Sequence, residues 1–104
     1  MTKIREFKEK QRYTMNLLVK NVVKGVTQKG APYLSLVLQD NSGTIDGKLW
    51  DASAEDMEAA KPGHVEQLSF EVLDYNNALQ LRVHSIQDLD QEPIDLSEYV
   101  MASP

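Results

Sequence analysis

Hydrophobic and polar residues alternate along most of this chain with the two-residue period that is typical of β-strands. The alternation predicts strands at residues 13–26, 33–39, 44–50, 68–72 and 79–83. In the second strand, Leu34, Leu36 and Leu38 fall on one side, so we expect all three to enter the core. Phe70 shares a side of the fourth strand with two other apolar residues and is also expected in the core.

Turn-forming residues separate the strands, and one interval has the pattern of a helix. Residues 40–43 (Asp-Asn-Ser-Gly) and the pair Asn76-Asn77 predict hairpin turns, because Asn and Gly tolerate positive φ. Residues 53–60 begin with Ser53, a good N-cap, and continue with acidic residues and helix formers. Lys61-Pro62-Gly63 ends this segment, so we expect a helix of about two turns.

The order of elements is three strands, a short helix and two strands, which is the element order of the OB-fold, a five-stranded Greek-key barrel. Because the other connections are short, we expect an all-β antiparallel barrel with one short helix between strands 3 and 4. Periodicity alone also allows an SH3-like barrel or another small α+β sheet. We assign the OB domain to residues 13–87, an N-terminal arm to residues 1–12 and an acidic tail or linker to residues 88–104.

Length and composition limit the kind of protein this can be. The 104 residues suffice for one domain and leave no room for a multidomain enzyme in this chain. The absence of cysteine excludes disulfides, thiolate nucleophiles and cysteine-ligated zinc. No apolar run approaches the roughly 20 residues that a membrane-spanning helix needs, and the N-terminus has no secretory signal. We therefore expect a cytoplasmic protein without membrane contact.

The charge is distributed unevenly along the chain. The net charge is −5, which by itself argues against a nucleic-acid partner. However, residues 1–50 hold nine Lys or Arg and four Asp or Glu, whereas residues 51–104 hold two and twelve. Such an asymmetry indicates a basic surface built by the first half of the chain and an acidic surface and tail built by the second.

Residues 30–50 resemble the second and third strands of nucleic-acid-binding OB domains. In those domains, a polar loop leads into alternating apolar residues, an Asp-x-Ser/Thr-Gly turn and a strand that ends in an aromatic residue. Here the turn is residues 40–43 and the aromatic residue is Trp50.

A wider set of segments looks like the N-terminal OB domain of YhaM-type 3′→5′ exoribonucleases. The segments that carry this resemblance are residues 3–7, 24–27, 48–51, 61–63, 79–81 and 95–97. Members of that family carry a metal-dependent HD phosphohydrolase domain after the OB domain. In this chain His64 precedes Val65 and His84 precedes Ser85, so there is no His-Asp doublet.

The resemblance therefore implies that the hydrolase domain, with its catalytic residues and divalent metal such as manganese, follows Pro104 in a longer parent. For this chain itself we expect no catalytic residue, no metal ligand and no cofactor. The expected partner is single-stranded RNA or DNA, and a homo-oligomer of the parent is a further option.

OB-folds bind single strands on the outer face of strands 2 and 3, between the first and fourth hairpin loops. Binding needs cations that follow the phosphates and flat side chains on which bases stack. The candidates are Lys20, Lys24, Lys29, Tyr33, Lys48, Trp50, Tyr75 and Arg82. Each lysine taken alone is explained by solvation, but their clustering in an otherwise acidic chain favours a site.

Strand alternation places Tyr33 and Trp50 on the same side as Lys48, away from the leucines. For Trp50 two interpretations stay open, because it ends a strand just before the helix. It either presents its ring to a base or packs beneath the helix as part of the core.

Three functions compete at this point. The first is binding of single-stranded nucleic acid without sequence preference, which would tether substrate to a hydrolase on the same polypeptide. The second is a protein-interaction or oligomerisation module, which the net negative charge favours. The third, a small self-sufficient enzyme, is disfavoured, since the two histidines have no metal-ligand spacing and the acids at residues 55–58 are typical of a helix terminus.

Overall fold

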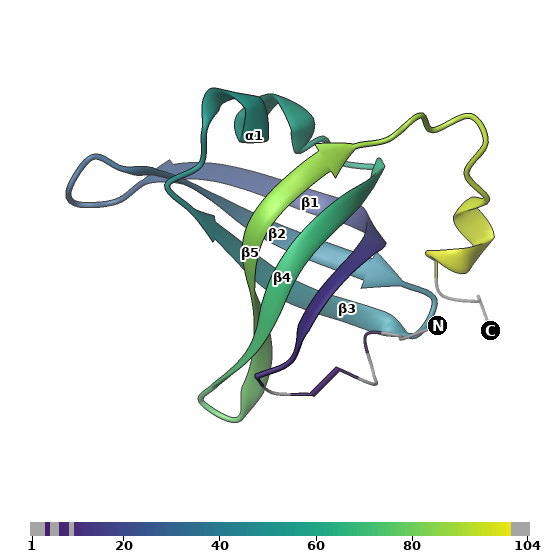
Figure 1. The fold of residues 1–104 in the computed structure, drawn as a ribbon, viewed down its shortest axis with the longest axis horizontal. Helices are drawn as coiled ribbons and strands as arrows, with labels where there is room; N and C mark the ends of the chain where they lie inside the picture. Colours follow the sequence, from purple (N-terminus) through teal and green to yellow (C-terminus); the bar gives the residue numbers. More distant parts are fainter. Residues whose placement is uncertain (1–3, 5–6, 9, 101–104) are drawn as a thin grey trace.

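The computed structural model describes residues 4, 7–8 and 10–100, and this part forms five β-strands and one α-helix in the predicted order. The elements are β1 (Arg12–Val26), β2 (Pro32–Asp40), β3 (Gly43–Trp50), α1 (Ala54–Ala59), β4 (Val65–Tyr75) and β5 (Ala78–Asp88). The strands close into a barrel in the order β1-β2-β3-β5-β4, with α1 across one end (Figure 1). This architecture confirms the predicted OB-fold. Across the described ranges no helix has the length and apolar character to cross a membrane.

One strand pairing corrects the expectation of an antiparallel barrel. β3 and β5 are parallel, with Gly47 opposite Leu81 and Lys48 opposite Arg82. The pairs β1–β2, β1–β4, β2–β3 and β4–β5 are antiparallel, as expected. The reason is the odd number of strands: directions cannot alternate all the way around a closed ring of five, so at least one neighbouring pair must be parallel.

The core lies where the alternation predicted it. Leu34, Leu36 and Leu38 are at most 1% exposed, and Phe70 is buried as well. Other strands contribute buried side chains at the same two-residue spacing, namely Leu17, Val19, Ile45, Leu49, Leu68, Val72, Leu81 and Val83. Each strand thus buries one face inside the barrel and leaves the other for solvent or a ligand.

The segment before β1 is docked on the barrel. Ile4 and Phe7 are buried, and the Phe7 ring lies 5.0 Å from that of Tyr13 and 5.4 Å from that of Phe70, measured between ring centroids. The backbone of Lys10 donates to the carbonyl of Val72 at 2.7 Å. The two large apolar residues of the predicted arm therefore extend the core.

The predicted turn and helix signals have their expected geometry. Asn76 and Asn77 have φ of 54° and 64°, the left-handed pair that a tight two-residue hairpin requires. Ser53 caps α1: its Oγ accepts from the Asp56 amide at 3.1 Å, and the Ser53 amide donates to the Asp56 carboxylate at 3.0 Å. This reciprocal capping box fixes where the helix begins.

The segment that follows β5 returns along the barrel. Gln91 bonds both backbone groups of Val65, donating to its carbonyl at 2.8 Å and accepting from its amide at 2.7 Å. Further on, the Gln39 side chain donates to the Tyr99 carbonyl at 2.9 Å. The segment expected as a tail is therefore attached to the barrel at both of these points.

The packing of Phe7 predicts that the N-terminal segment contributes to global stability. Phe7→Ala is expected to lower the free energy of unfolding by about 3 kcal/mol, because it removes a buried ring and leaves a cavity against Phe70. Urea denaturation followed by circular dichroism measures this change. Val26→Ala is the control, since Val26 is 66% exposed and its truncation is expected to cost no more than about 0.5 kcal/mol. An equal effect of the two substitutions would contradict the docked position of Phe7.

Candidate functional site

Three of the predicted residues meet on the outward face of β2 and β3. Tyr33 and Trp50 are directly opposite each other, and their ring centroids are 5.3 Å apart with the planes tilted by 40°. Lys48 Nζ lies 5.5 Å from the centroid of the Tyr33 ring and donates to Ser35 Oγ at 3.0 Å. Cross-strand partners share a face of the sheet, so the register itself brings these side chains together.

Trp50 lies on the surface of the barrel and is not packed in the core beneath α1. Its side chain is 47% exposed and contacts Tyr33, while the preceding Leu49 is buried. Alternation along β3 is therefore maintained up to its last residue. An aromatic pair of this kind presents flat apolar area next to a cation.

Gly25 on β1 makes room for the Tyr33 ring. Gly25 is opposite Tyr33, and a Cβ at this position would overlap the Tyr33 ring. The absence of a side chain thus leaves the space that the ring occupies. The amino-acid pattern gave no sign of this role, because it depends on the pairing register of β1 with β2.

Arg82 and Lys29 lie next to this group. The parallel pairing places Arg82 beside Lys48 on the outside of the barrel, and Glu71 of β4 is opposite Arg82 on its other side. Lys29 belongs to the β1–β2 loop, where it lines a hollow of about 430 Å³ together with Trp50 and other loop residues. Cations therefore lie at both ends of the aromatic pair.

The other predicted residues are placed apart from this cluster. Lys24 is opposite Leu34, so its side chain projects from the face that does not carry Tyr33. Lys20 lies at a β-bulge of β1, between the positions that pair with β2. Tyr75 is 66% exposed at the tip of the β4–β5 hairpin, on the same side of the hairpin as Arg82. In Figure 1 this hairpin and the β1–β2 loop project from the barrel as two separate arms.

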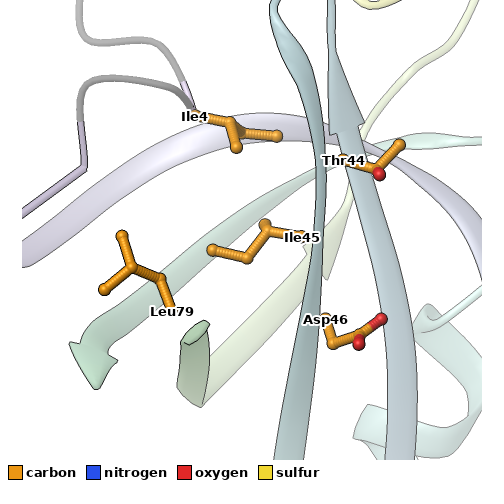
Figure 2. Close-up of a pocket in the computed structure, with 5 residues that line it drawn as sticks. All are labelled: Ile4, Thr44, Ile45, Asp46 and Leu79. Carbon is orange, nitrogen blue, oxygen red and sulfur yellow. The ribbon is translucent and has the colours of Figure 1, made fainter. Parts of the chain in front are cut away.

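A pocket near the start of β3 does not belong to this face. Figure 2 shows Ile45 directed toward Ile4 and Leu79, whereas Thr44 and Asp46 project from the opposite side of the strand. Because polar groups do not converge inside it, the pocket is a gap at the edge of the core and lacks the features of a ligand site.

A second polar cluster joins the start of β4 to the end of β5. His64 Nδ1 lies 3.1 Å from Asp88 Oδ1, and Lys61 Nζ lies 3.2 Å from Asp88 Oδ2. Glu66 is opposite Asp88 and is 0% exposed, and its Oε2 accepts from the Lys61 amide at 3.1 Å. Sequence inspection treated the two histidines singly and missed this cluster. The His64-x-Glu66 spacing was the available signal, since residues two apart share a face of a strand.

Burial dominates the electrostatics of the second cluster. Burial, with a smaller contribution from the Asp88 carboxylate, raises the pKa of Glu66 from 4.5 to about 7, although the Lys61 amide acts to lower it. For Asp88, desolvation also acts to raise the pKa, but hydrogen bonds from His64 and Lys61 together lower it below its usual value. Two neighbouring carboxylates therefore have pKa values shifted in opposite directions.

Solved structures of similar fold include chains of replication protein A and of PriB. The second OB-fold domain of replication protein A from Methanococcus maripaludis is 25% identical, with a TM-score of 0.67 over 88% of this chain and 96% of that one. A replication protein A heterotrimer bound to ssDNA matches with a TM-score of 0.61 and 15% identity over 88% of this chain and 63% of that one. PriB from Ralstonia solanacearum matches with a TM-score of 0.60 and 15% identity over 76% and 97% of the two chains.

These likenesses, together with the five-stranded closed barrel, define the chain as an OB-fold domain. No family model matches it.

The shifted pKa of Glu66 predicts that Glu66→Gln stabilises the protein at alkaline pH. Between pH 4.5 and about 7 the folded state keeps a proton that the unfolded state has released, so wild-type stability falls as the pH rises through this window. The glutamine variant avoids this loss. Its free energy of unfolding is expected to exceed that of wild type by about 3 kcal/mol at pH 8, with the difference shrinking toward pH 5.

Urea denaturation at pH 5, 6, 7 and 8, in buffer without divalent cations, measures this difference. The other titratable groups of the cluster, Lys61, His64 and Asp88, are the same in both proteins, so the difference reports on Glu66. Glu71→Gln is the matched control, because it makes the same chemical change on the outer face of the same strand. The free energy of unfolding of Glu66→Gln relative to wild type should grow from pH 5 to pH 8. A difference that stays constant would show that Glu66 is not buried in its charged form.

Proposed function

We propose that this domain binds single-stranded nucleic acid across the outward face of β2 and β3, without reading the base sequence. The observation that carries the proposal is the exposed Tyr33–Trp50 pair with Lys48 beside it. Stacking on an aromatic side chain contributes roughly 1–3 kcal/mol per base and tolerates every base, because each base has a π face. The likeness to a replication protein A heterotrimer that is bound to ssDNA supports the proposal.

The positions of the side chains support one path for a bound nucleic-acid strand. At one end, the β1–β2 loop contributes Lys29 and the hollow beside Trp50. At the other, Arg82 lies next to Lys48, and the β4–β5 hairpin carries the exposed Tyr75. A nucleic-acid strand that crosses β3 between these two arms would meet the aromatic pair first. It would then meet Lys48 of β3 and Arg82 of β5.

The charges of this face set the expected salt dependence. Three cations, Lys29, Lys48 and Arg82, are available for phosphates, whereas the net charge of the chain is −5. Each phosphate contact with a single strand contributes about −0.7 to the slope of log K against log salt concentration, so the expected slope is about −2. Affinity at physiological salt therefore depends on stacking more than on charge.

Trp50 provides a direct measurement of binding, because it is the only tryptophan of the chain. Titration with a 15-nucleotide oligo-dT is expected to quench its fluorescence. Tyr33→Ala is expected to weaken binding by about 5- to 150-fold, the equivalent of 1–3 kcal/mol of stacking. Tyr33→Phe, which keeps the ring, is the matched control and should bind as wild type does. Unchanged affinity of the alanine variant, with its fold verified by circular dichroism, would contradict the stacking role.

A pair of lysines tests which face is used. Lys48→Ala is expected to weaken oligonucleotide binding and to reduce the salt slope by about 0.7, because one phosphate contact is lost. Lys24→Ala makes the same change on the opposite face and is expected to leave the slope unchanged. Fluorescence anisotropy at 50 to 300 mM NaCl measures both slopes. Equal losses in the two variants would contradict the assignment to the Tyr33 face.

The finer proposal is that the domain belongs to a YhaM-type 3′→5′ exoribonuclease and holds RNA for a metal-dependent HD hydrolase domain on the same polypeptide. It is supported by the sequence resemblance, which includes Lys48-Leu49-Trp50-Asp51 and Lys61-Pro62-Gly63. Tethering raises the local substrate concentration. In such a parent, Tyr33→Ala should slow RNA degradation at limiting substrate and have no effect at saturation. Equal slowing at both concentrations would contradict tethering.

The competing proposal is a protein-interaction or oligomerisation module. Val23 and Val26, which are 55% and 66% exposed near the end of β1, favour it, as does the heterotrimeric assembly of the replication protein A neighbour. Sedimentation velocity with and without oligo-dT separates the two functions. Concentration-dependent self-association together with unquenched Trp50 would favour the interaction module.

A further inference from the structure

The second polar cluster holds three side chains of the types that ligate metals. His64, Glu66 and Asp88 each offer a nitrogen or oxygen, and these ligand atoms lie within 4.8 Å of one another. The fold brings them together: His64 immediately precedes β4, Glu66 follows two residues later, and Asp88 is opposite Glu66 at the end of β5. None of the three belongs to the Tyr33–Trp50 face.

An unpaired buried oxygen indicates that this cluster is incomplete as it stands. Glu66 is 0% exposed, and its Oε1 has no hydrogen-bond partner among the residues that the structure describes. Its other oxygen accepts from the Lys61 amide at 3.1 Å. A buried carboxylate oxygen without a partner carries a desolvation penalty that a bound cation would offset.

We propose that His64, Glu66 and Asp88 form a binding site for a divalent transition-metal cation of the zinc type. Zinc accepts imidazole nitrogen and carboxylate oxygen together, at bond lengths of about 2.0–2.2 Å, which in tetrahedral geometry place two donors about 3.3–3.6 Å apart. The donors now lie within 4.8 Å of one another, so the side chains would rotate toward the cation to reach this spacing. The imidazole disfavours magnesium and calcium, which prefer oxygen ligands throughout.

The present contacts of Asp88 are compatible with this role. Its Oδ1 lies 3.1 Å from His64 Nδ1 and accepts from the Leu89 amide at 3.0 Å. The cation would take the place of the His64–Asp88 contact, while the backbone bond remains. Lys61, on Oδ2, has a side chain that is 53% exposed and can turn toward solvent. His64 is partly exposed and provides the entry path.

The position of the site gives it a structural consequence. Gln91, three residues after Asp88, bonds both backbone groups of Val65, which lies between His64 and Glu66. A cation would therefore fasten the start of the C-terminal segment to the start of β4. Metal binding is expected to stabilise the folded chain and to hold residues 89–91 in their observed position.

The test uses the full chain without a polyhistidine tag, titrated with ZnCl₂ in a calorimeter at pH 7.5. We expect one zinc per chain and a rise in the melting temperature that EDTA reverses. In NMR spectra, the ring signals of His64 should shift and those of His84 should not. These are the only two histidines of the chain, which makes the comparison simple.

Two variants and one matched control complete the test. Glu66→Gln keeps the shape of the side chain, and His64→Gln removes the imidazole. Each is expected to weaken zinc binding at least tenfold, since even the loss of an outer-shell partner costs about 10- to 100-fold in affinity. His84→Gln, which alters the exposed histidine on β5, should bind zinc as wild type does.

Four outcomes would overturn the proposal: no 1:1 binding at millimolar zinc, a shift of His84 instead of His64, wild-type affinity in both site variants when each is folded by circular dichroism, or displacement of zinc by an equal concentration of magnesium. None of these outcomes bears on oligonucleotide binding. The zinc site and the nucleic-acid interface are therefore tested independently.

Discussion

The parallel pairing of β3 with β5 closes the barrel, and the candidate interface depends on it. On the inner side of this pair, Gly47 leaves room for Val83, whose Cγ2 would lie only 3.3 Å from a Cβ at that position. On the outer side, the same pairing sets Lys48 beside Arg82. A closed ring of five strands requires a parallel neighbour somewhere. Because the parallel pair is β3 and β5, Lys48 from the first half of the chain and Arg82 from the second half lie on one face.

The aromatic pair extends this face by a second local constraint. Strand alternation decides that Tyr33 and Trp50 point outward, but the Tyr33 ring also needs the space that the missing side chain of Gly25 leaves. Lys48 then lies against the ring and bonds Ser35, which orients its ammonium group without burying it. Three neighbouring strands thus pre-organise a stacking platform and a cation, so little side-chain entropy remains to be lost when a ligand binds.

The sequence predicts what depends on local periodicity and turns. Alternation identified the core leucines, the outward set of Tyr33, Lys48 and Trp50, and the Asn76-Asn77 turn. It could not supply what depends on register between distant strands. The parallel closing pair, the space at Gly25 and the docking of Phe7 are contacts of this kind. Connection lengths describe only consecutive strands, so they could not reveal that β3 and β5 pair in parallel.

The same limit explains why the cluster around Glu66 could not be predicted from the sequence. The burial of Glu66 in this cluster also lowers the stability of the folded chain. A carboxylate that is fully buried and has one hydrogen bond among the described residues is unfavourable for stability, since a neutral side chain of the same shape avoids the penalty of burying a charge. The net stability of a small domain is only about 5–15 kcal/mol, so a penalty of about 3 kcal/mol is a large part of it. Stability alone therefore does not explain Glu66, whereas a bound cation would account for both its burial and its unpaired oxygen.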